Sequence, residues 1–359
     1  MKRLIGPVLL AVLILGVGAA IFLSAREQFA LRQVVTVHGL IGSEKEAFFR
    51  DPRVIQELRK GGVDVQIEKA GSRTIATNYD LSKYDFAFPA GVPSAEKIRQ
   101  SQKSSKSYDV FFTPMAIASW KSIADLLVAN GVAKNMGGYY TLDLAVYLQY
   151  VTAEKRWSDL QNNSAYPVNK SILIISTDVR KSNSAAMYLA LASFVANDNN
   201  VVQSDGDIQK VLPLMESLFL KQGYTEYSSE VPFEDYLSMG VGKAPMVMIY
   251  EAQFIYQAMQ ENGLTDEMVL IYPEPSIYSK HILVSLSPNG EKLGDLLQNN
   301  PELQRLEIEH GFRNANSAYF RQTTQKHNLN IPNTLVNIIE PPSYEVLERM
   351  IQLIEQKYN

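Results

Sequence analysis

The chain has 359 residues, of which 46% are hydrophobic, which is enough for a packed core and, at this length, for two domains. Its net charge of −4 and pI near 5.7 leave no basic surface for nucleic acid, so we do not expect a nucleic-acid partner. The lack of cysteine excludes disulfides, thiolate metal sites, a cysteine nucleophile and the lipid-modified cysteine of a bacterial lipoprotein.

The first segment is typical of a membrane anchor. Two basic residues precede an uncharged apolar run, and about 20 residues at 1.5 Å each span the hydrocarbon core. We therefore predict a cytoplasmic tip, a transmembrane helix at 4–24 and a linker within residues 1–33, in a single-pass cell-membrane protein with an extracytoplasmic body. A cleaved signal peptide is the alternative, although the residues after Leu23 match a cleavage site poorly.

The next residues alternate between predicted strands and helices. Strands are expected at 33–40, 63–67 and 84–88, with a helical stretch at 46–62. Pro52 interrupts that stretch or begins its second part. Strand, helix, strand predicts a parallel sheet, whose ligands collect beyond the carboxyl ends of the strands. Those ends are Gly42-Ser43 and Gly71-Ser72-Arg73.

A further buried strand is predicted at 108–118, followed by helices at 120–130 and 141–154. Thr113-Pro114 is expected to break the strand, because proline cannot donate to a strand ladder. Pro114 therefore marks a predicted crossing point between two domains.

Residues 172–197 combine a predicted strand, a polar turn and a buried helix. The apolar run at 172–175 has strand length, and Ser182, Asn183 and Ser184 are good N-cap residues before an apolar helix. A helix N-terminus carries unpaired N–H groups and roughly half a positive charge, so hydroxyls gathered there can bind an anion or a carboxylate. Helix capping alone is the simpler interpretation.

The tetrad Gly240-Val241-Gly242-Lys243 follows an amphipathic helix predicted at 208–222. A phosphate-binding loop would need glycine at the position of Leu237 and serine or threonine at that of Ala244. The tetrad is therefore predicted to be a turn.

Residues 245–255 form an apolar, strand-like run in which Glu251 is embedded and a helix begins. A carboxylate in such a run is costly unless it is paired or solvated in a cleft, and a salt-bridged or surface glutamate is the alternative to a cleft residue. Later strands are predicted at 268–272 and 281–286, and helices at 290–299, 301–310 and 344–358, the last as a packing arm.

The order of these parts resembles the bacterial extracellular solute-binding proteins of the type II periplasmic-binding fold, a group that includes molybdate- and sulfate-type receptors. The resemblance covers about 34–313 and depends on Gly42-Ser43, the turn at 176–184, the run at 246–251 and the closing 309–313. It implies two α/β lobes joined by two crossing strands. Lobe 1 would comprise 34–113 and 248–330, lobe 2 would comprise 114–247, and 331–359 would form a C-terminal helical extension.

The resemblance also implies a ligand in the cleft between the lobes. The implied ligand-binding residues are Ser43, Ser72, Arg73, Ser182, Asn183, Ser184, Tyr250 and Glu251. Two features depart from the family pattern: Val179 stands where relatives often have proline, and the predicted membrane helix replaces the lipid-modified cysteine.

We therefore expect a membrane-anchored receptor that captures a small ligand, anionic or carboxylate-bearing, for an ABC-type transporter or a sensor. The alternative is a structural or sensing component of an envelope complex that reuses the fold. An enzyme is less consistent with the sequence, because it has no Gly-x-Ser-x-Gly elbow and nothing fixes the distance of a Glu44–Glu251 acid/base pair. We expect no cofactor and no metal, since the four histidines stand apart from one another and are predicted to be surface or packing residues.

Overall fold

The computed structural model describes residues 34–102, 106–223 and 226–358. None of the helices in these ranges is long and apolar enough to span a membrane. The transmembrane helix predicted at 4–24 lies outside the described residues, as does the rest of 1–33.

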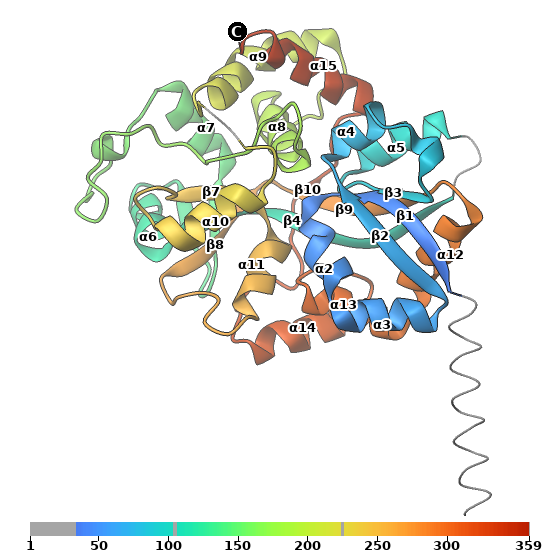
Figure 1. Cartoon of the computed structure of the whole chain (residues 1–359). Helices are drawn as coiled ribbons and strands as arrows, with labels where there is room; N and C mark the ends of the chain where they lie inside the picture. Colours follow the sequence, from blue (N-terminus) through green and yellow to red (C-terminus); the bar gives the residue numbers. More distant parts are fainter. Residues whose placement is uncertain (1–33, 103–105, 224–225, 359) are drawn as a thin grey trace, which may run out of the picture.

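A ten-stranded mixed sheet runs through the molecule in the order β2-β1-β3-β9-β4-β8-β6-β5, with β10 paired to β9 and β7 to β4 (Figure 1). β1 lies between β2 and β3 and is parallel to both, as the predicted strand-helix-strand pattern requires. The strands are Val35–Ile41 (β1), Val63–Lys69 (β2), Phe86–Phe88 (β3), Ser107–Trp120 (β4), Ala133–Asn135 (β5), Tyr140–Asp143 (β6), Met246–Tyr250 (β7), Met268–Glu274 (β8), Ser276–Ser285 (β9) and Ile338–Ile339 (β10).

Strand β4 connects two halves of the sheet. It pairs with β9 as far as Pro114, and from Met115 onward it pairs with β7 and then also with β8. The predicted break at Thr113-Pro114 is wrong, because Pro114 keeps its place opposite Tyr278 and the strand continues. We call the part built on β1, β2, β3, β9 and the start of β4 the first half, and the part built on β5 to β8 the second half.

Helices cover both halves (Figure 1). Those of the first half are Glu46–Arg50 (α2), Pro52–Lys60 (α3), Ser72–Thr77 (α4), Val92–Ser101 (α5), Pro288–Asn299 (α12) and Pro301–Glu309 (α13), with a short 3-10 helix at Ser43–Lys45. Those of the second half are Lys121–Ala129 (α6), Leu144–Thr152 (α7), Asn183–Ala196 (α8), Asp205–Leu220 (α9) and Glu230–Met239 (α10). The remaining helices are Glu251–Ala258 (α11), Ser317–Lys326 (α14) and Tyr344–Glu355 (α15).

Each half has its own apolar core. In the first half, aromatic rings from β3, β4 and α2 pack with Phe312, including a stacked pair of Phe111 and Phe312 whose ring centroids are 4.1 Å apart. In the second half, α8 is buried on most of its faces, against α7, α9 and β7. Its many alanine and leucine residues explain this burial, because no polar side chain on its central turns requires solvent.

Most predicted elements are present, but the strand predicted at 172–175 is wrong. The amides of this segment find partners in different places: Ile172 donates to the Lys155 carbonyl, Ile174 to the Tyr147 hydroxyl and Ile175 to the Met246 carbonyl. Only Ile175 forms a β-bridge, to Val247 in β7. The segment therefore contributes Ile172 and Ile174 to the core without belonging to a strand ladder.

The C-terminal helix α15 packs against both halves, on α9 and α8 of the second and α5 of the first (Figure 1). Strand β8, which the predicted division assigns to lobe 1, pairs in the structure with β6 and with the second part of β4. The chain therefore remains within the second half as far as β8 and returns to the first half through β9.

Candidate ligand-binding site

A cavity of about 230 Å³ lies where the two halves meet. The first half contributes the residues that follow β1 and β2, and the second half contributes the starts of α8 and α10 and the end of β7. Seven lining residues carry a hydroxyl group: Ser43, Ser72, Ser182, Tyr227, Ser228, Ser229 and Tyr250. We call this space the hydroxyl cavity. Its place beyond the carboxyl ends of two parallel strands is where α/β sheets bind ligands.

Two helices begin at the hydroxyl cavity. Ser182 is the N-cap of α8 and makes no side-chain capping bond, while Ser229 is the N-cap of α10. The Ser228 hydroxyl accepts a hydrogen bond from the amide of Glu230 at 3.2 Å. The first amides of a helix have no partner within the helix and carry partial positive charge, so the two starts together favour an anionic group in the cavity.

Direct contacts join the halves around the cavity. The hydroxyl oxygens of Ser43 and Ser228 are 2.7 Å apart, and the Asn183 side-chain amide donates to the Ala90 carbonyl at 2.9 Å. At Gly71 a Cβ atom would lie 2.2 Å from the backbone oxygen of Lys181, so only glycine permits this approach. The cavity is therefore flanked by contacts that any separation of the halves would break.

Five of the eight predicted site residues line the hydroxyl cavity: Ser43, Ser72, Ser182, Asn183 and Tyr250. The buried Ser72 hydroxyl accepts a hydrogen bond from the amide of Ala90 at 2.9 Å. Asn183 donates to the Tyr250 hydroxyl at 3.1 Å. Burial raises the pKa of Tyr250 well above its ordinary value, and repulsion by the Glu44 carboxylate adds to the shift. Tyr250 therefore stays protonated and can donate a hydrogen bond.

The structure places the other three predicted site residues elsewhere. Arg73 pairs with Glu348 of α15 and donates to the Arg180 carbonyl at 2.6 Å, so its side chain lies beside α15. Ser184 is fully buried and bonds the hydroxyls of Thr177 and Ser182. Glu251 is fully buried and forms a salt bridge with Arg313, as the alternative interpretation predicts.

Residues from the start of α10 were missed by the sequence analysis. Tyr227, Ser228, Ser229 and Glu230 line the cavity, but no helix was predicted at Glu230–Met239. A usable signal was present, since two serines precede a glutamate and Pro232 falls in the first helical turn, where proline is tolerated.

A buried charged group supports Glu44 at the edge of the cavity. Lys45 is fully buried and its ammonium donates to the Glu44 carboxylate; it also lies 3.0 Å from Nδ1 of His281. Burial lowers the pKa of Lys45, opposed by the attraction of Glu44, and burial also lowers the pKa of His281 well below its ordinary value. His281 is therefore neutral and accepts from Lys45, which fixes the position of Glu44.

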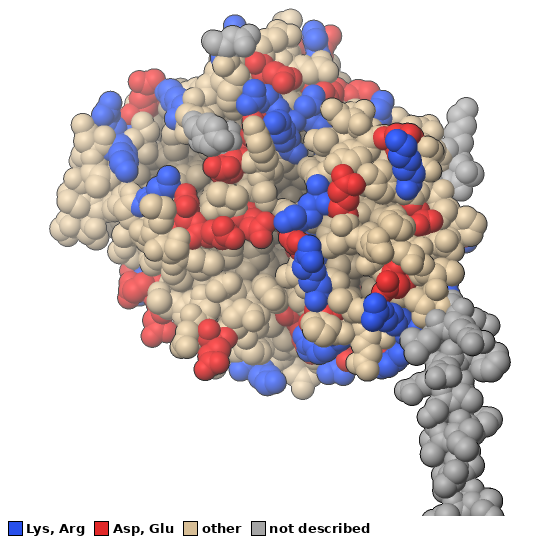
Figure 2. Space-filling model, viewed as in Figure 1, with Lys and Arg blue, Asp and Glu red and all other residues tan. Residues whose placement is uncertain are grey.

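A second cavity, of about 360 Å³, adjoins the first, and Ser43, Glu44 and Glu230 line both. Glu46 and Glu234 also line it, and no lysine or arginine does. We call it the acidic cavity. Figure 2 shows acidic side chains gathered over α10, where Glu230 and Glu234 lie.

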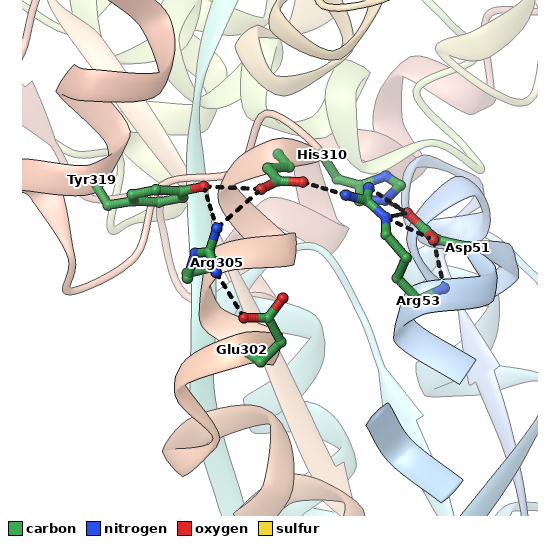
Figure 3. Close-up of polar contacts among 7 residues, drawn as sticks. Asp51, Arg53, Glu302, Arg305, His310 and Tyr319 are labelled. Atoms are coloured by element: carbon green, nitrogen blue, oxygen red, sulfur yellow. Dashed lines mark hydrogen bonds and ion pairs between the residues drawn. The ribbon is translucent and has the colours of Figure 1, made fainter. Parts of the chain in front are cut away.

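A third cavity, of about 600 Å³, lies beside α3, α13 and α14, and a network of ion pairs and hydrogen bonds runs through its lining (Figure 3). Arg53 pairs with Asp51 and Glu309, and the Tyr319 hydroxyl donates to Glu309 at 2.9 Å. Arg305, which also lines the cavity, pairs with Glu302, which does not. This network explains the fold of the region without a ligand, so the hydroxyl cavity is the better candidate.

Among the described residues, no group of three or more histidine, aspartate or glutamate side chains is placed to hold a metal ion. No protein-family model matches the sequence, and no curated protein sequence matches it significantly. The fold, however, has many solved counterparts.

The ferric ion-binding protein A of Pasteurella haemolytica superposes with a TM-score of 0.56 at 11% identity, over 89% of this chain and 97% of its own. The chain has the fold of the bacterial periplasmic solute-binding proteins. The periplasmic binding protein AfuA of Actinobacillus pleuropneumoniae, with fructose-6-phosphate bound, has a TM-score of 0.55 at 11% identity, over 90% and 98% of the two chains. The sulfate-binding protein SubI of Mycobacterium tuberculosis H37Rv has a TM-score of 0.50 at 13% identity, over 90% and 100%.

Proposed function

We propose that this protein is an extracytoplasmic solute-binding protein that holds the anionic group of a small ligand in the hydroxyl cavity. The observation that carries the proposal is the meeting of two helix starts and seven hydroxyl-bearing residues at the junction of the two halves. Such a site offers several hydrogen-bond donors together with partial positive charge.

The lining chemistry supports an oxyanion or carboxylate more than a neutral ligand. Lys69 brings an ammonium group to the lining, paired with Glu46, and Glu44 and Glu230 bring two carboxylates. The protonated Tyr250 and the serine hydroxyls can each donate a hydrogen bond to an anionic group. Two proteins with the same fold carry related ligands in their names: SubI is a sulfate-binding protein, and the AfuA structure holds fructose-6-phosphate. Both of those ligands contain an oxyanion.

We further propose that the ligand is passed to an ABC-type transporter at the membrane and that the segment at 4–24 tethers the protein there. One structure with this fold is described as an ABC transporter from Clostridium perfringens, with a TM-score of 0.50. In this proposal a bound ligand adds contacts to both halves and so favours the closed arrangement over any open one.

Ser182→Ala tests the site. Ser182 makes no capping bond and its hydroxyl bonds only that of Ser184, so its loss should cost about 1 kcal/mol of folding stability, whereas a lost hydrogen bond to a charged ligand is worth about 1.5–3 kcal/mol. We expect about tenfold or greater weakening of binding, measured by calorimetry with the best ligand from a thermal-shift panel of sulfate, phosphate, sugar phosphates and short carboxylates.

Ser193→Ala is the matched control, since Ser193 lies in the same helix and bonds the Ala190 carbonyl away from the cavity. It should leave the affinity unchanged. Equal affinities for the two variants would reject the site. A folded protein that no member of the panel stabilises would instead favour the structural or sensing component of an envelope complex.

A further inference from the structure

The acidic cavity is continuous with the hydroxyl cavity but, unlike it, has no lysine or arginine among its described lining residues. The residues Ser43, Glu44 and Glu230 line both, so a ligand held in the first can reach the second. Of these two cavities, the hydroxyl cavity is lined by one lysine, Lys69, and the acidic cavity by four glutamates. A purely anionic ligand would leave this second space unused and would be repelled by it.

The carboxylates of the acidic cavity differ in how far they are neutralised. Glu44 is paired with Lys45, and Glu46 is paired with Arg50 and Lys69. Within the part of the chain that the structure describes, Glu230 and Glu234 have no lysine or arginine at ion-pair distance. Burial raises the pKa of Glu230; the attraction of Lys69 opposes the rise, and repulsion by Glu234, Glu46 and Glu44 adds to it. The region therefore holds uncompensated negative charge.

His310 adds an independent observation at the same cavity. Its side chain is 4% exposed, it lines the acidic cavity, and its Nδ1 atom has no hydrogen-bond partner among the described residues. Its Nε2 atom lies 3.0 Å from Asp51, whose pKa falls to about 2 because hydrogen bonds from Arg53 and His310 outweigh its burial. Nε2 therefore carries the hydrogen.

Burial lowers the pKa of His310 despite the attraction of Asp51, so the ring is neutral and Nδ1 is left as a buried, unused acceptor. The ring stacks on Tyr256, with centroids 4.9 Å apart, and Tyr256 and Phe233 supply the aromatic part of the cavity wall. Carboxylates, an imidazole acceptor and aromatic rings together complement a cation that carries several N–H donors.

We propose that the ligand is bipolar, with its anionic group in the hydroxyl cavity and a primary ammonium group in the acidic cavity beside Glu230 and Glu234. This inference rests on the proposed function, because it assumes that the hydroxyl cavity holds the anionic end. It narrows the ligand to small amine-bearing phosphates, phosphonates or carboxylates. Glu230 and Glu234 then determine specificity for the ammonium end.

Two matched ligand pairs test the inference by calorimetry on the purified full-length chain in detergent. Ethyl phosphate is compared with O-phosphoethanolamine, and propionate with β-alanine. The two members of each pair share the anionic group, and only the second carries an amine at the other end. In at least one pair the amine-bearing member should bind about tenfold or more tightly, since it gains a charge-assisted hydrogen bond to the partly buried Glu230 carboxylate.

The double variant Glu230→Gln/Glu234→Gln should bring that ratio close to one. Because Glu230 also lines the hydroxyl cavity, the loss of its negative charge should tighten the binding of the amine-free member. Glu261→Gln removes a charge from an exposed loop position outside both cavities and should keep the wild-type ratio. A ratio near one in the wild type, or a preference that survives in the double variant, overturns the inference and leaves the proposed function standing. If none of the four compounds nor any oxyanion binds, the proposed function fails and the inference with it.

Discussion

Replacing Glu307 with glutamine is expected to stabilise the protein strongly at pH 9 and only slightly at pH 5. Glu307 lies in α13 and is fully buried. One carboxyl oxygen accepts a hydrogen bond from Asn314 at 2.8 Å, and the other has no partner among the described residues. Burial raises the pKa of Glu307 to about 8, partly offset by the bond from Asn314. The group is therefore a neutral acid in the folded protein at neutral pH.

The direction of the pH effect follows from proton linkage. In the unfolded chain Glu307 ionises near its ordinary pKa of 4.5, whereas in the folded protein its pKa is about 8 and it holds its proton up to that pH. Between these two pKa values the folded state binds more protons than the unfolded state. The contribution of Glu307 to the free energy of unfolding is therefore fully present below pH 4.5 and is lost as the pH rises through about 8. Over pH 5 to 9 this group alone should cost about 4 kcal/mol.

Urea unfolding of wild type and Glu307→Gln at pH 5 and pH 9 measures this difference. The contributions of the other titrating groups to the free energy of unfolding are the same in both proteins and cancel. Glutamine keeps the shape and an oxygen acceptor for Asn314 but cannot ionise. Glu302→Gln is the control, since Glu302 lies in the same helix with a side chain that is 48% exposed. A stability difference between wild type and Glu307→Gln that does not change with pH would show that this carboxyl is not a buried neutral acid.

The fold could be predicted from local patterns because most elements carry their own signals. Pro52 at the first position of α3, the N-cap Ser182 and the apolar run of β7 each place an element correctly. The strand predicted at 172–175 was wrong because an apolar run indicates only burial. A buried segment with a partner strand and one without have the same apolar pattern. Whether such a segment joins a sheet depends on residues that are distant in the sequence.

The candidate site could be predicted only in part, for a similar reason. Ser43, Ser72 and Ser182 follow from the rule that ligands gather at strand ends and helix starts. Arg73 also follows a strand end, but its side chain pairs with Glu348 of α15, which lies 275 positions later, and does not line the hydroxyl cavity. The local sequence around Arg73 contains no sign of that partner.

Glu251 was predicted as a site residue with a salt bridge as the alternative, and the structure shows a buried ion pair. Its carboxylate accepts two hydrogen bonds from Arg313, each 2.7 Å long, and one from the Tyr272 hydroxyl. Arg313 also donates to the carbonyls of Pro332 and Asn333. The carboxylate is fully buried and the arginine side chain is 5% exposed, so neither charge can be hydrated if its partner is lost.

Arg313→Met is therefore expected to destabilise the protein by about 3–5 kcal/mol, the usual cost of breaking a buried ion pair from one side. The variant leaves the Glu251 carboxylate buried with Tyr272 as its remaining bonded partner and frees two backbone carbonyls. Urea unfolding at neutral pH measures the loss. Arg305→Met removes an arginine that pairs with Glu302 at 48% exposure, and its cost should stay within about 1 kcal/mol.

The double variant Glu251→Gln/Arg313→Met distinguishes a lost pair from lost packing. Once the carboxylate is neutral, the charge that made Arg313→Met costly is gone, so the double variant should be less destabilised than the sum of the two single variants. Strict additivity would mean that the arginine stabilises this junction through its stacking over Phe320 and its bonds to the 332–333 carbonyls. The Glu251 carboxylate would then contribute to stability through Tyr272 alone, a residue of β8 in the second half.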